Sequence, residues 1–221
     1  MFKKLYSYLI PLNIFKQKSV LSKTLEITWT NGELVLDSEN TNYSYGSLQR
    51  ILRKGLKTIG FERIVPMQHI LVLGVAGGSV IKTLIDEIHY KGKITGVEID
   101  PEIIKIANEY FKLNEILNLE IVNEDAFEFV LKTKNRYDLI IIDVFQDTTM
   151  PNFLFEKFFT DRLDFLLNPK GIILFNTMIL NKADEARNKN YIDSCDQKKF
   201  EIKPIPKVEQ HNELIIIEKI Y

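Results

Sequence analysis

Several features that would point to particular classes of protein are scarce in this sequence. Cysteine occurs once among the 221 residues, at Cys195, and histidine occurs three times. A single cysteine forms no internal disulfide, so nothing in the sequence indicates an oxidising compartment. The histidines share no spacing typical of metal ligands, so we predict no metal site.

Neither sign of charge dominates, and long apolar runs are missing. Lysine and arginine number 29 against 30 aspartates and glutamates, which gives a formal net charge of −1. This balance leaves no basic field that would attract nucleic acid, so no nucleic-acid partner is expected. The partly apolar segment 1–15 is interrupted by Pro11 and is too short to span a bilayer. We therefore expect a cytoplasmic protein with no membrane partner.

What is present is the composition of a globular protein, 45% hydrophobic and 27% charged. Residues 24–37, TLEITWTNGELVLD, alternate in polarity around an Asn-Gly dipeptide, which strongly favours a β-hairpin. Apolar residues at helical spacing over 46–60 predict a helix. We divide the chain into an N-terminal arm and hairpin, 1–45, and a larger domain, 46–221. The mixed charges at 182–203 indicate a solvated surface.

The larger domain alternates strand-like and helix-like segments. Its continuous apolar runs occupy residues 69–74, 93–100, 118–125, 137–143 and 171–176. Such alternation is typical of a parallel sheet covered by helices on both faces. The tail adds two strands with a turn near His211-Asn212. We therefore predict an α/β fold of the class I methyltransferase (Rossmann-like) type, a doubly wound seven-stranded sheet with a small N-terminal β-hairpin extension.

The first strand of that sheet ends in a glycine-rich loop that leads directly into a helix. The loop reads Gly74-Val75-Ala76-Gly77-Gly78-Ser79. Small residues at the carboxyl end of a parallel strand let a ligand approach the backbone. The dinucleotide pattern G-x-G-x-x-G fails here at Ala76 and Ser79, whereas the looser G-x-G-x-G loop of S-adenosylmethionine (AdoMet) binders fails only at Ala76. The loop therefore favours an AdoMet-type nucleoside, although packing alone is an alternative explanation.

Carboxylates end the next two strands. Glu98, followed by Ile99, stands where it can accept both ribose hydroxyls, in charge-assisted bonds of about 1.5–3 kcal/mol each. Asp125 stands where it can accept the adenine amino group, with Ala126 among the neighbours of the ring. The alternatives are a solvated strand-end glutamate and an aspartate that only caps the next helix.

Asp143 ends the fourth strand and faces the same edge of the sheet. A carboxylate between donor and acceptor can orient or deprotonate an acceptor amine, and a bond to local amides is the alternative. Asp147 is a weaker candidate for the same role. Together these residues predict a nucleoside site beside a small-molecule acceptor site.

These motifs resemble the spermidine synthase (polyamine aminopropyltransferase) family over roughly residues 24–218. The likeness includes LVLD at 34–37, SY at 44–45, the glycine loop, VEID at 97–100, DAFEF at 125–129 and YDLIIID at 137–143. The resemblance implies that Glu98 and Asp125 hold the nucleoside, and that Asp143 and Tyr45 lie at the acceptor amine. It also implies that the N-terminal arm and hairpin are the contact surface of a homodimer.

The sequence departs from the family pattern in three motifs and in a short loop between Asp37 and Tyr45. The family loop reads G-G-G-D-G-G, and Gly77 stands at the position of its acid. The resemblance implies that this acid binds decarboxylated AdoMet in preference to ordinary AdoMet, whose carboxylate it repels. The family stretch D-S-S-D-P reads Asp143-Val144-Phe145-Gln146-Asp147, so its second acid is lost unless Asp147 compensates. The late I-P-x-Y-P segment reads IPKVE at 205–209, without the tyrosine.

Three functions follow from this comparison. The first is an AdoMet-dependent transferase, most simply a methyltransferase on a spermidine-synthase-like scaffold, with Asp143 orienting or deprotonating the acceptor. The second is a polyamine aminopropyltransferase that uses decarboxylated AdoMet. The third is a non-catalytic nucleoside-binding or interaction module.

Overall fold

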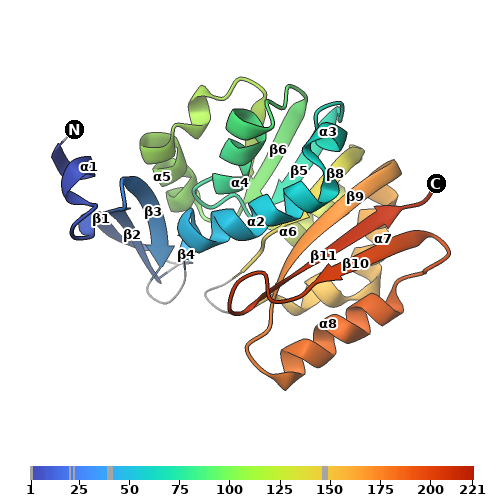
Figure 1. The fold of residues 1–221 in the computed structure, drawn as a ribbon. Coiled ribbons are helices and arrows are strands. Elements are labelled where there is room, and N and C mark those ends of the chain that lie inside the picture. The colour runs from blue at the N-terminus through green and yellow to red at the C-terminus, as the bar shows by residue number, and fades with distance from the viewer. Residues whose placement is uncertain (1, 20, 22, 39–41, 146–148) are drawn as a thin grey trace.

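The computed structural model describes residues 2–19, 21, 23–38, 42–145 and 149–221, and these form two β-sheets (Figure 1). The smaller sheet is antiparallel and joins, in order, β1 (Leu12–Ser19), β2 (Lys23–Thr30), β3 (Glu33–Ser38) and β4 (Asn42–Ser44). A short helix, α1 (Phe2–Tyr6), precedes it.

The predicted hairpin is confirmed as β2 and β3. Thr30 pairs with Glu33, and the two residues between them have positive φ, 49° at Asn31 and 79° at Gly32. A two-residue hairpin turn requires positive φ at both residues if its backbone twist is to match the right-handed twist of the flanking strands. The hairpin prediction was incomplete, however, because β1 and β4 pair on either side of it. Strand β1 is an edge strand with its apolar residues in its first half and the polar run KQKS in its second, so no apolar alternation continues through it to reveal a strand.

The larger sheet has seven strands and confirms the predicted fold class. Its order is β10 (Phe200–Ile205), β11 (Asn212–Lys219), β9 (Leu167–Met178), β8 (Tyr137–Ile142), β5 (His69–Leu73), β6 (Lys93–Glu98) and β7 (Leu119–Asn123). Strands β5 to β9 are parallel, and β11 runs antiparallel to both β9 and β10. The chain order reverses at β5, which lies between β6 and β8, and ligands of open α/β sheets bind at such a switch point.

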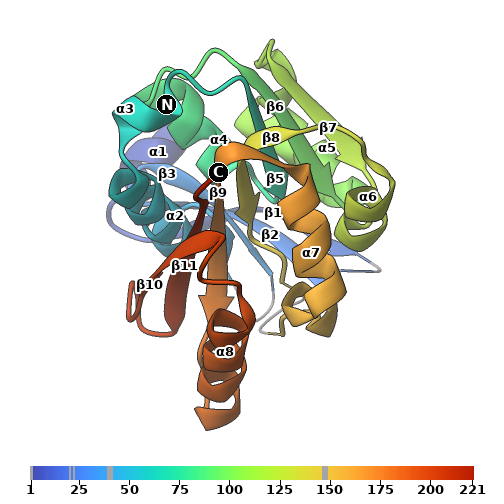
Figure 2. The same ribbon diagram turned by 90° about the vertical axis from the view of Figure 1, so that its right-hand side faces the viewer.

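Helices cover both faces of this sheet. They are α2 (Gly46–Ile59), α3 (Phe61–Ile64), α4 (Ser79–Lys82) with the π-helical turn η1 (Thr83–Glu87), α5 (Pro101–Phe111), α6 (Ala126–Lys132), α7 (Lys157–Leu166) and α8 (Lys182–Ser194), with short 3-10 turns η2 (Leu113–Glu115) and η3 (Asn152–Phe155). Figure 2 shows α2 on one side of the sheet and α6 and α7 on the other.

Alternate residues of the central strands enter two separate hydrophobic cores. On β5, Ile70 and Val72 belong to the core that includes α2 and α4, whereas Leu71 and Leu73 belong to the core that includes α6 and α7. All four are fully buried. Burial on both faces explains why the strands appear in the sequence as continuous apolar runs.

The small sheet packs against α5. Leu25, Ile27 and Leu36 of the sheet share a hydrophobic cluster with Ile103 and Ile106 of the helix. Two polar contacts add to this packing: the Ser19 hydroxyl lies 2.5 Å from Asp100 Oδ2, and Gln17 Nε2 donates to Glu102 Oε2 at 2.6 Å. The sheet is therefore docked beside the end of β6.

The N-terminal arm leaves several apolar side chains exposed. Leu5, Tyr8 and Leu9 in the N-terminal arm are more than half exposed, and the homodimer contact expected there stays a prediction.

The charged segment 182–203 begins with α8, a surface helix whose first turn is capped by the Asn181 side chain. No helix in the described part of the chain is both long and apolar enough to cross a membrane.

Candidate functional site

The carboxyl ends of the parallel strands meet at a cavity of about 400 Å³. This volume lies in the range of ~300–1,000 Å³ typical of small-molecule sites. The start of α2 and the turn between β10 and β11 also contribute residues to its lining. Seven predicted site residues line it: Gly74, Ala76, Glu98, Ile99, Asp125, Ala126 and Asp143. The structure thus brings together residues from four separate motifs.

Other predicted site residues have different positions. Val75, Gly77, Gly78 and Tyr45 are described but are not among the residues that line this cavity. Asp147 lies outside the described residues, so its suggested role stays a prediction.

Glu98 connects the end of β6 to the glycine loop. Its Oε2 accepts hydrogen bonds from the backbone N–H groups of Val75 at 3.1 Å and Ala76 at 3.0 Å. Its Oε1 accepts from the N–H of Asp100 at 3.1 Å. Burial raises the pKa of Glu98, and these backbone donors oppose the rise. Each carboxylate oxygen has two lone pairs, so Oε2 is fully used by two bonds and Oε1 can accept one more. That Glu98 accepts from both ribose hydroxyls stays a prediction.

The loop after β5 has the backbone that a glycine-rich turn requires. Gly74 has φ +85°, and a Cβ there would lie 2.2 Å from the carbonyl oxygen of Asp143. Ala76 also has positive φ, 46°, where the resembled loop pattern has glycine. The left-handed conformation costs a non-glycine residue about 1–2 kcal/mol. The loop therefore keeps its shape although one glycine is missing.

Gly77 is required for space. A Cβ at this position would lie 2.8 Å from Cβ and 2.9 Å from Oγ of Ser44, and 3.2 Å from the ring of Phe111. Ser44 is 1% exposed, and its hydroxyl accepts from the N–H of Ser79 at 3.2 Å. The position where the family pattern has an acid is thus closed off by the end of β4.

Asp125 is the N-cap of α6. Its Oδ1 accepts from the N–H groups of Phe127 at 2.7 Å and Glu128 at 3.4 Å. The capping role considered for this residue is therefore real. Asp125 also lines the cavity, so its second oxygen is available for the predicted bond to an adenine amino group.

Asp143 follows β8, and Asn176 near the end of β9 donates to it. The bond runs from Asn176 Nδ2 to Asp143 Oδ1 at 2.8 Å. Burial raises the pKa of Asp143 to about 6, the negative charge of Glu98 adds to the rise, and the bond from Asn176 opposes it. A carboxylate with this pKa is ionised at neutral pH and can still accept a proton.

Tyr45 packs away from the cavity lining. It has φ +70°, and its ring stacks on Phe111 with the centroids 4.7 Å apart. Burial raises the pKa of its phenol, and the charges of Asp86 and Glu33 add to the rise. The phenol is therefore protonated at neutral pH, and its predicted place at the acceptor stays a prediction.

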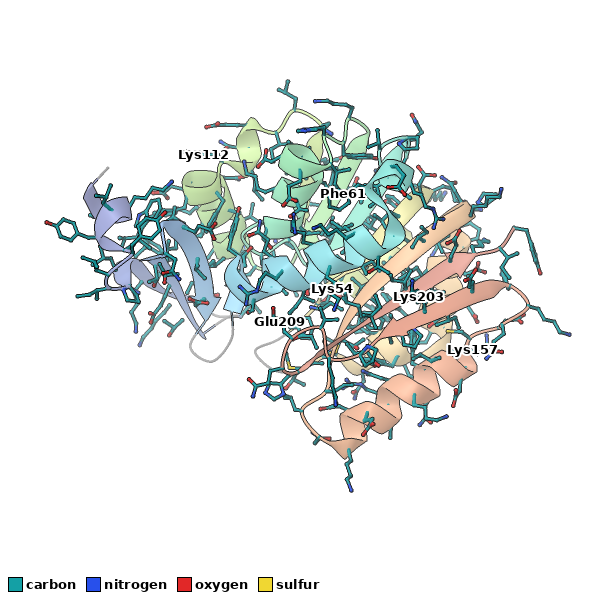
Figure 3. The ribbon with its side chains drawn as sticks, in the orientation of Figure 1. Lys54, Phe61, Lys112, Lys157, Lys203 and Glu209 are labelled. Carbon is teal, nitrogen blue, oxygen red and sulfur yellow. The ribbon has the colours of Figure 1, made fainter. Side chains whose placement is uncertain are left out.

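Sequence reasoning missed the wall of the cavity formed by β9 and the β10–β11 turn. Asn176, Met178 and His211 line the cavity, as does Glu209. Glu209 accepts from Arg50 Nε of α2 at 2.9 Å, and Figure 3 labels Glu209 on the turn near that helix. The one available signal was Asn176, a polar residue at the end of an apolar run.

The lining is strongly acidic. Among the described residues it includes five carboxylates and no lysine or arginine; the acids are Glu98, Glu124, Asp125, Asp143 and Glu209. Glu124 and Glu209 pair with Lys132 and Arg50, at 2.7 and 2.9 Å. The remaining three have no ion pair in the described part of the chain. A cavity of this kind favours a cationic or neutral ligand over an anionic one.

Within the ranges that the structure describes, no group of three or more His, Cys, Asp or Glu side chains is placed to hold a metal ion.

Curated proteins with similar sequences are transferases by name. A probable polyamine aminopropyl transferase of Bifidobacterium longum is 29% identical over 124 residues, which cover 56% of this chain and 27% of that protein. A polyamine aminopropyltransferase of Vibrio vulnificus is 28% identical over 127 residues, 56% of this chain and 42% of that protein. The eEF1A lysine and N-terminal methyltransferase homolog of Drosophila melanogaster is 25% identical over 185 residues, 76% of this chain and 26% of that protein. The chain thus matches less than half the length of each relative.

Solved structures share the fold at low sequence identity. Spermidine synthase from Thermotoga maritima superposes with a TM-score of 0.71 at 18% identity, covering 95% of this chain and 73% of that one. Human methyltransferase-like protein 13 in complex with SAH gives a TM-score of 0.65 at 20% identity, covering 80% and 83%. The model of the spermine/spermidine synthase domain matches residues 51–215. This chain therefore belongs to the spermine/spermidine synthase domain family.

Proposed function

We propose that this chain is a transferase that uses AdoMet to methylate the nitrogen of an amine. The observation that carries the proposal is the acidic cavity at the strand ends, which Asp143 lines and whose described lining includes no lysine or arginine. Such a site stabilises a cationic acceptor and offers a carboxylate to take its proton.

The described residues fit a nucleoside at one end of the cavity. Glu98 and Asp125 both line it, and each has carboxylate capacity left for a ribose or an adenine amino group. Gly74 has φ +85°, and a Cβ there would lie 2.2 Å from the carbonyl oxygen of Asp143, so glycine lets the loop pack closely on the end of β8. When bound, the nucleoside supplies an electrophilic carbon on a sulfonium sulfur.

Asp143 acts on the acceptor. The cationic acceptor first loses a proton, which frees the lone pair of its nitrogen. The nitrogen then bonds to the donor carbon as the carbon–sulfur bond breaks, and the electron pair of that bond stays on sulfur. Asp143 accepts the proton that the nitrogen loses and passes it to solvent, which its pKa of about 6 permits. Holding the reactants in line supplies much of the acceleration.

Gly77 favours AdoMet as donor over its decarboxylated form. An acid at this position would repel the carboxylate of AdoMet, and Ser44 occupies the space that its side chain would need. The relative whose match covers most of this chain among those described above, 76%, is named as a lysine and N-terminal methyltransferase homolog, and both of those acceptors are amines.

Aminopropyl transfer from decarboxylated AdoMet is the second candidate. The observation in its favour is the same acidic lining, because no lysine or arginine among the described residues faces the cavity to pair with the AdoMet carboxylate. The relatives from Bifidobacterium longum and Vibrio vulnificus are named for this transfer.

Parallel titration with the two donors tests the proposal. A donor at 100 times its Kd should stabilise the fold by about 2.7 kcal/mol, which a thermal-shift assay detects. Each donor is then incubated with monoamines, diamines and a lysine peptide, and the products are identified by mass. Methylated amine supports the proposal, and an aminopropylated amine replaces it with the second candidate. Donor binding with no product from any amine would support a non-catalytic nucleoside-binding module.

A further inference from the structure

Asn176 is a fully buried polar side chain that contacts the reactive end of the cavity. It lies near the carboxyl end of β9 and is 0% exposed. The parallel pairing of β8 with β9 places Ile142 beside Phe175, so Asp143 and Asn176 follow next on adjacent strands. Both line the cavity.

The two ends of the Asn176 amide have different partners. Nδ2 donates to Asp143 Oδ1 at 2.8 Å, and Oδ1 accepts from Asn212 Nδ2 at 3.0 Å. The bond from Asn212 fixes the orientation of the amide, because a flipped amide would set its oxygen against a carboxylate and its NH₂ against another NH₂. Asn212 comes from β11, where it pairs with Met178 in the antiparallel register.

These contacts leave the two oxygens of Asp143 in different states. Oδ1 is held by Asn176, and no hydrogen bond to Oδ2 occurs within the part of the chain that the structure describes. The backbone of Asp143 is also fixed, since its N–H donates to Leu73 O at 2.9 Å and its carbonyl oxygen lies under Gly74. The carboxylate therefore has one committed oxygen and one oxygen that is available to a ligand.

We propose that Asn176, oriented by Asn212, is a positioning residue that holds Oδ1 of Asp143 so that Oδ2 faces the acceptor nitrogen. The proposal rests on the transferase function proposed above. In the reaction, Oδ2 takes the proton that the acceptor nitrogen loses, while Oδ1 keeps its bond to Asn176. The same bond favours the ionised carboxylate that accepts this proton.

The charged groups around Asp143 affect its pKa and therefore the pH profile of the reaction. The titratable groups that line the same cavity come from three places in the fold: Glu98 on β6, Glu124 and Asp125 between β7 and α6, and Glu209 and His211 on the β10–β11 turn. Of these, Glu98 is the one whose charge raises the pKa of Asp143. Replacing Asn176 leaves all of them in place, so a shift in the profile reports the lost hydrogen bond.

The test replaces Asn176 with leucine, which has a similar size and donates no hydrogen bond. The acid limb of the kcat/KM profile should move to higher pH by about one to two units, because a bond to a charged group is lost. AdoMet affinity should stay near that of the wild type, since Glu98 and Asp125 are untouched. Asn212→Ser, a milder change, should shift the limb in the same direction by less.

Asn188→Leu is the matched control. Asn188 of α8 is 1% exposed, and its Nδ2 donates to Thr177 Oγ1 and Glu213 Oε2, both at 2.9 Å. These two partners belong to β9 and β11, as Asn176 and Asn212 do, but they do not line the cavity. Asn188→Leu should lower stability and leave the acid limb in place. The proposal would be overturned if Asn176→Leu folded and bound AdoMet but kept the acid limb of its kcat/KM profile at the wild-type pH. It would also be overturned if Asn188→Leu shifted that limb as much as Asn176→Leu does.

A measurement that needs no turnover separates this proposal from the proposed function. The pKa of Asp143 is read from the ¹³C shift of its carboxyl carbon, assigned by its loss in Asp143→Asn. A higher pKa in Asn176→Leu, or in Asn212→Ser if the leucine variant does not fold, supports the positioning role even if no amine is methylated. An unchanged pKa in a folded variant refutes it, whatever the reaction.

Discussion

Replacing Asp143 with asparagine should make the folded protein more stable at neutral pH while it removes most of the turnover. Burial raises the pKa of Asp143 from 3.8 to about 6, and the charge of Glu98 adds to this rise. Ionising Asp143 is therefore less favourable in the folded protein than in the unfolded chain. Asparagine removes the charge but keeps the oxygen to which Asn176 Nδ2 donates at 2.8 Å. The hydrogen bond should therefore survive the change.

The size of the effect follows from the pKa. A rise of about two pH units, at 1.36 kcal/mol per unit, corresponds to about 3 kcal/mol as an upper bound. Asp143 is only half-buried and faces the cavity, so solvent screening reduces the value, and we expect ~1–2 kcal/mol. For a domain of this length each kcal/mol shifts Tm by roughly 2–4 °C, so the variant should melt about 2–8 °C higher at pH 8.

The pH dependence has a definite sign. Between pH 4 and about 6 the folded protein binds more protons at Asp143 than the unfolded chain does, so this residue lowers stability as the pH rises through that window. Below the unfolded pKa the carboxyl group is neutral in both states. The difference in stability between Asp143→Asn and the wild type should therefore be small near pH 4 and reach its full value above pH 6.

Urea unfolding at several pH values, together with single-turnover assays, tests both expectations. Turnover should fall by about 10²- to 10⁴-fold, the usual contribution of a general base, with AdoMet affinity nearly unchanged. Asp161→Asn is the control, because this carboxylate on α7 is 62% exposed and, among the described residues, has its one ion pair with Lys157. Its stability should change by less than about 0.5 kcal/mol. An Asp143→Asn that is less stable than the wild type at pH 8, with its fold intact, would refute the argument from burial.

Two further predictions concern the donor end of the cavity. Gly77→Ala should lower the free energy of unfolding by about 1–3 kcal/mol, because its Cβ would lie 2.8 Å from that of Ser44. In urea melts, adding Ser44→Gly to Gly77→Ala should recover part of this loss. If the losses in free energy of unfolding of the two single variants simply added in the double variant, the contact with Ser44 would not be the cause. Asp125→Ala should lose about 0.5–2 kcal/mol through the missing helix cap and also weaken AdoMet binding. Asp125→Asn should keep the cap, so calorimetry that finds the same stability loss in both variants would contradict the capping argument.

The strand ends could be predicted because the signal for each is local. A buried parallel strand appears as an apolar run, and a polar residue that interrupts it marks the carboxyl end where ligands bind. Glu98 and Asp143 were found in this way, and both line the cavity. The resemblance to a family then assigned each of them a role.

The contacts between these residues could not be predicted, because they depend on pairings between distant segments. The bond between Asn176 and Asn212 follows from the register of β9 against β11, which places Leu214 opposite Asn176. No local pattern specifies that register. The bonds from the loop amides of Val75 and Ala76 to Glu98 likewise depend on how β5 and β6 pair.

Helix α8 was missed for a different reason. Its burial is limited to Asn188 and Tyr191, so it has no apolar stripe at helical spacing. Tyr191 packs on Phe155 and Phe175, the Asn181 side chain caps the first turn, and exposed pairs such as Lys189 with Asp193 add little. Surface charges of this kind look the same in a helix and in a loop.

The position of Ser44 changes the meaning of the missing family acid. Sequence alone suggests that Gly77 deletes one charge, and that restoring an aspartate would restore selection against AdoMet. The structure places Cβ and Oγ of Ser44 within 2.9 Å of a Cβ at position 77, so an aspartate there would also require Ser44 to shift.

The small sheet is accordingly a structural part of the donor end of the cavity. Ser44 packs over Gly77, and its hydroxyl accepts from the N–H of Ser79 at the start of α4. The Ser19 hydroxyl contacts the side chain of Asp100, whose own N–H donates to Glu98 Oε1. Both links reach residues that shape the glycine loop or the ribose-binding carboxylate predicted from sequence. Changes in the first 45 residues should therefore alter donor affinity as well as stability, which a hairpin serving only as a subunit contact would not do.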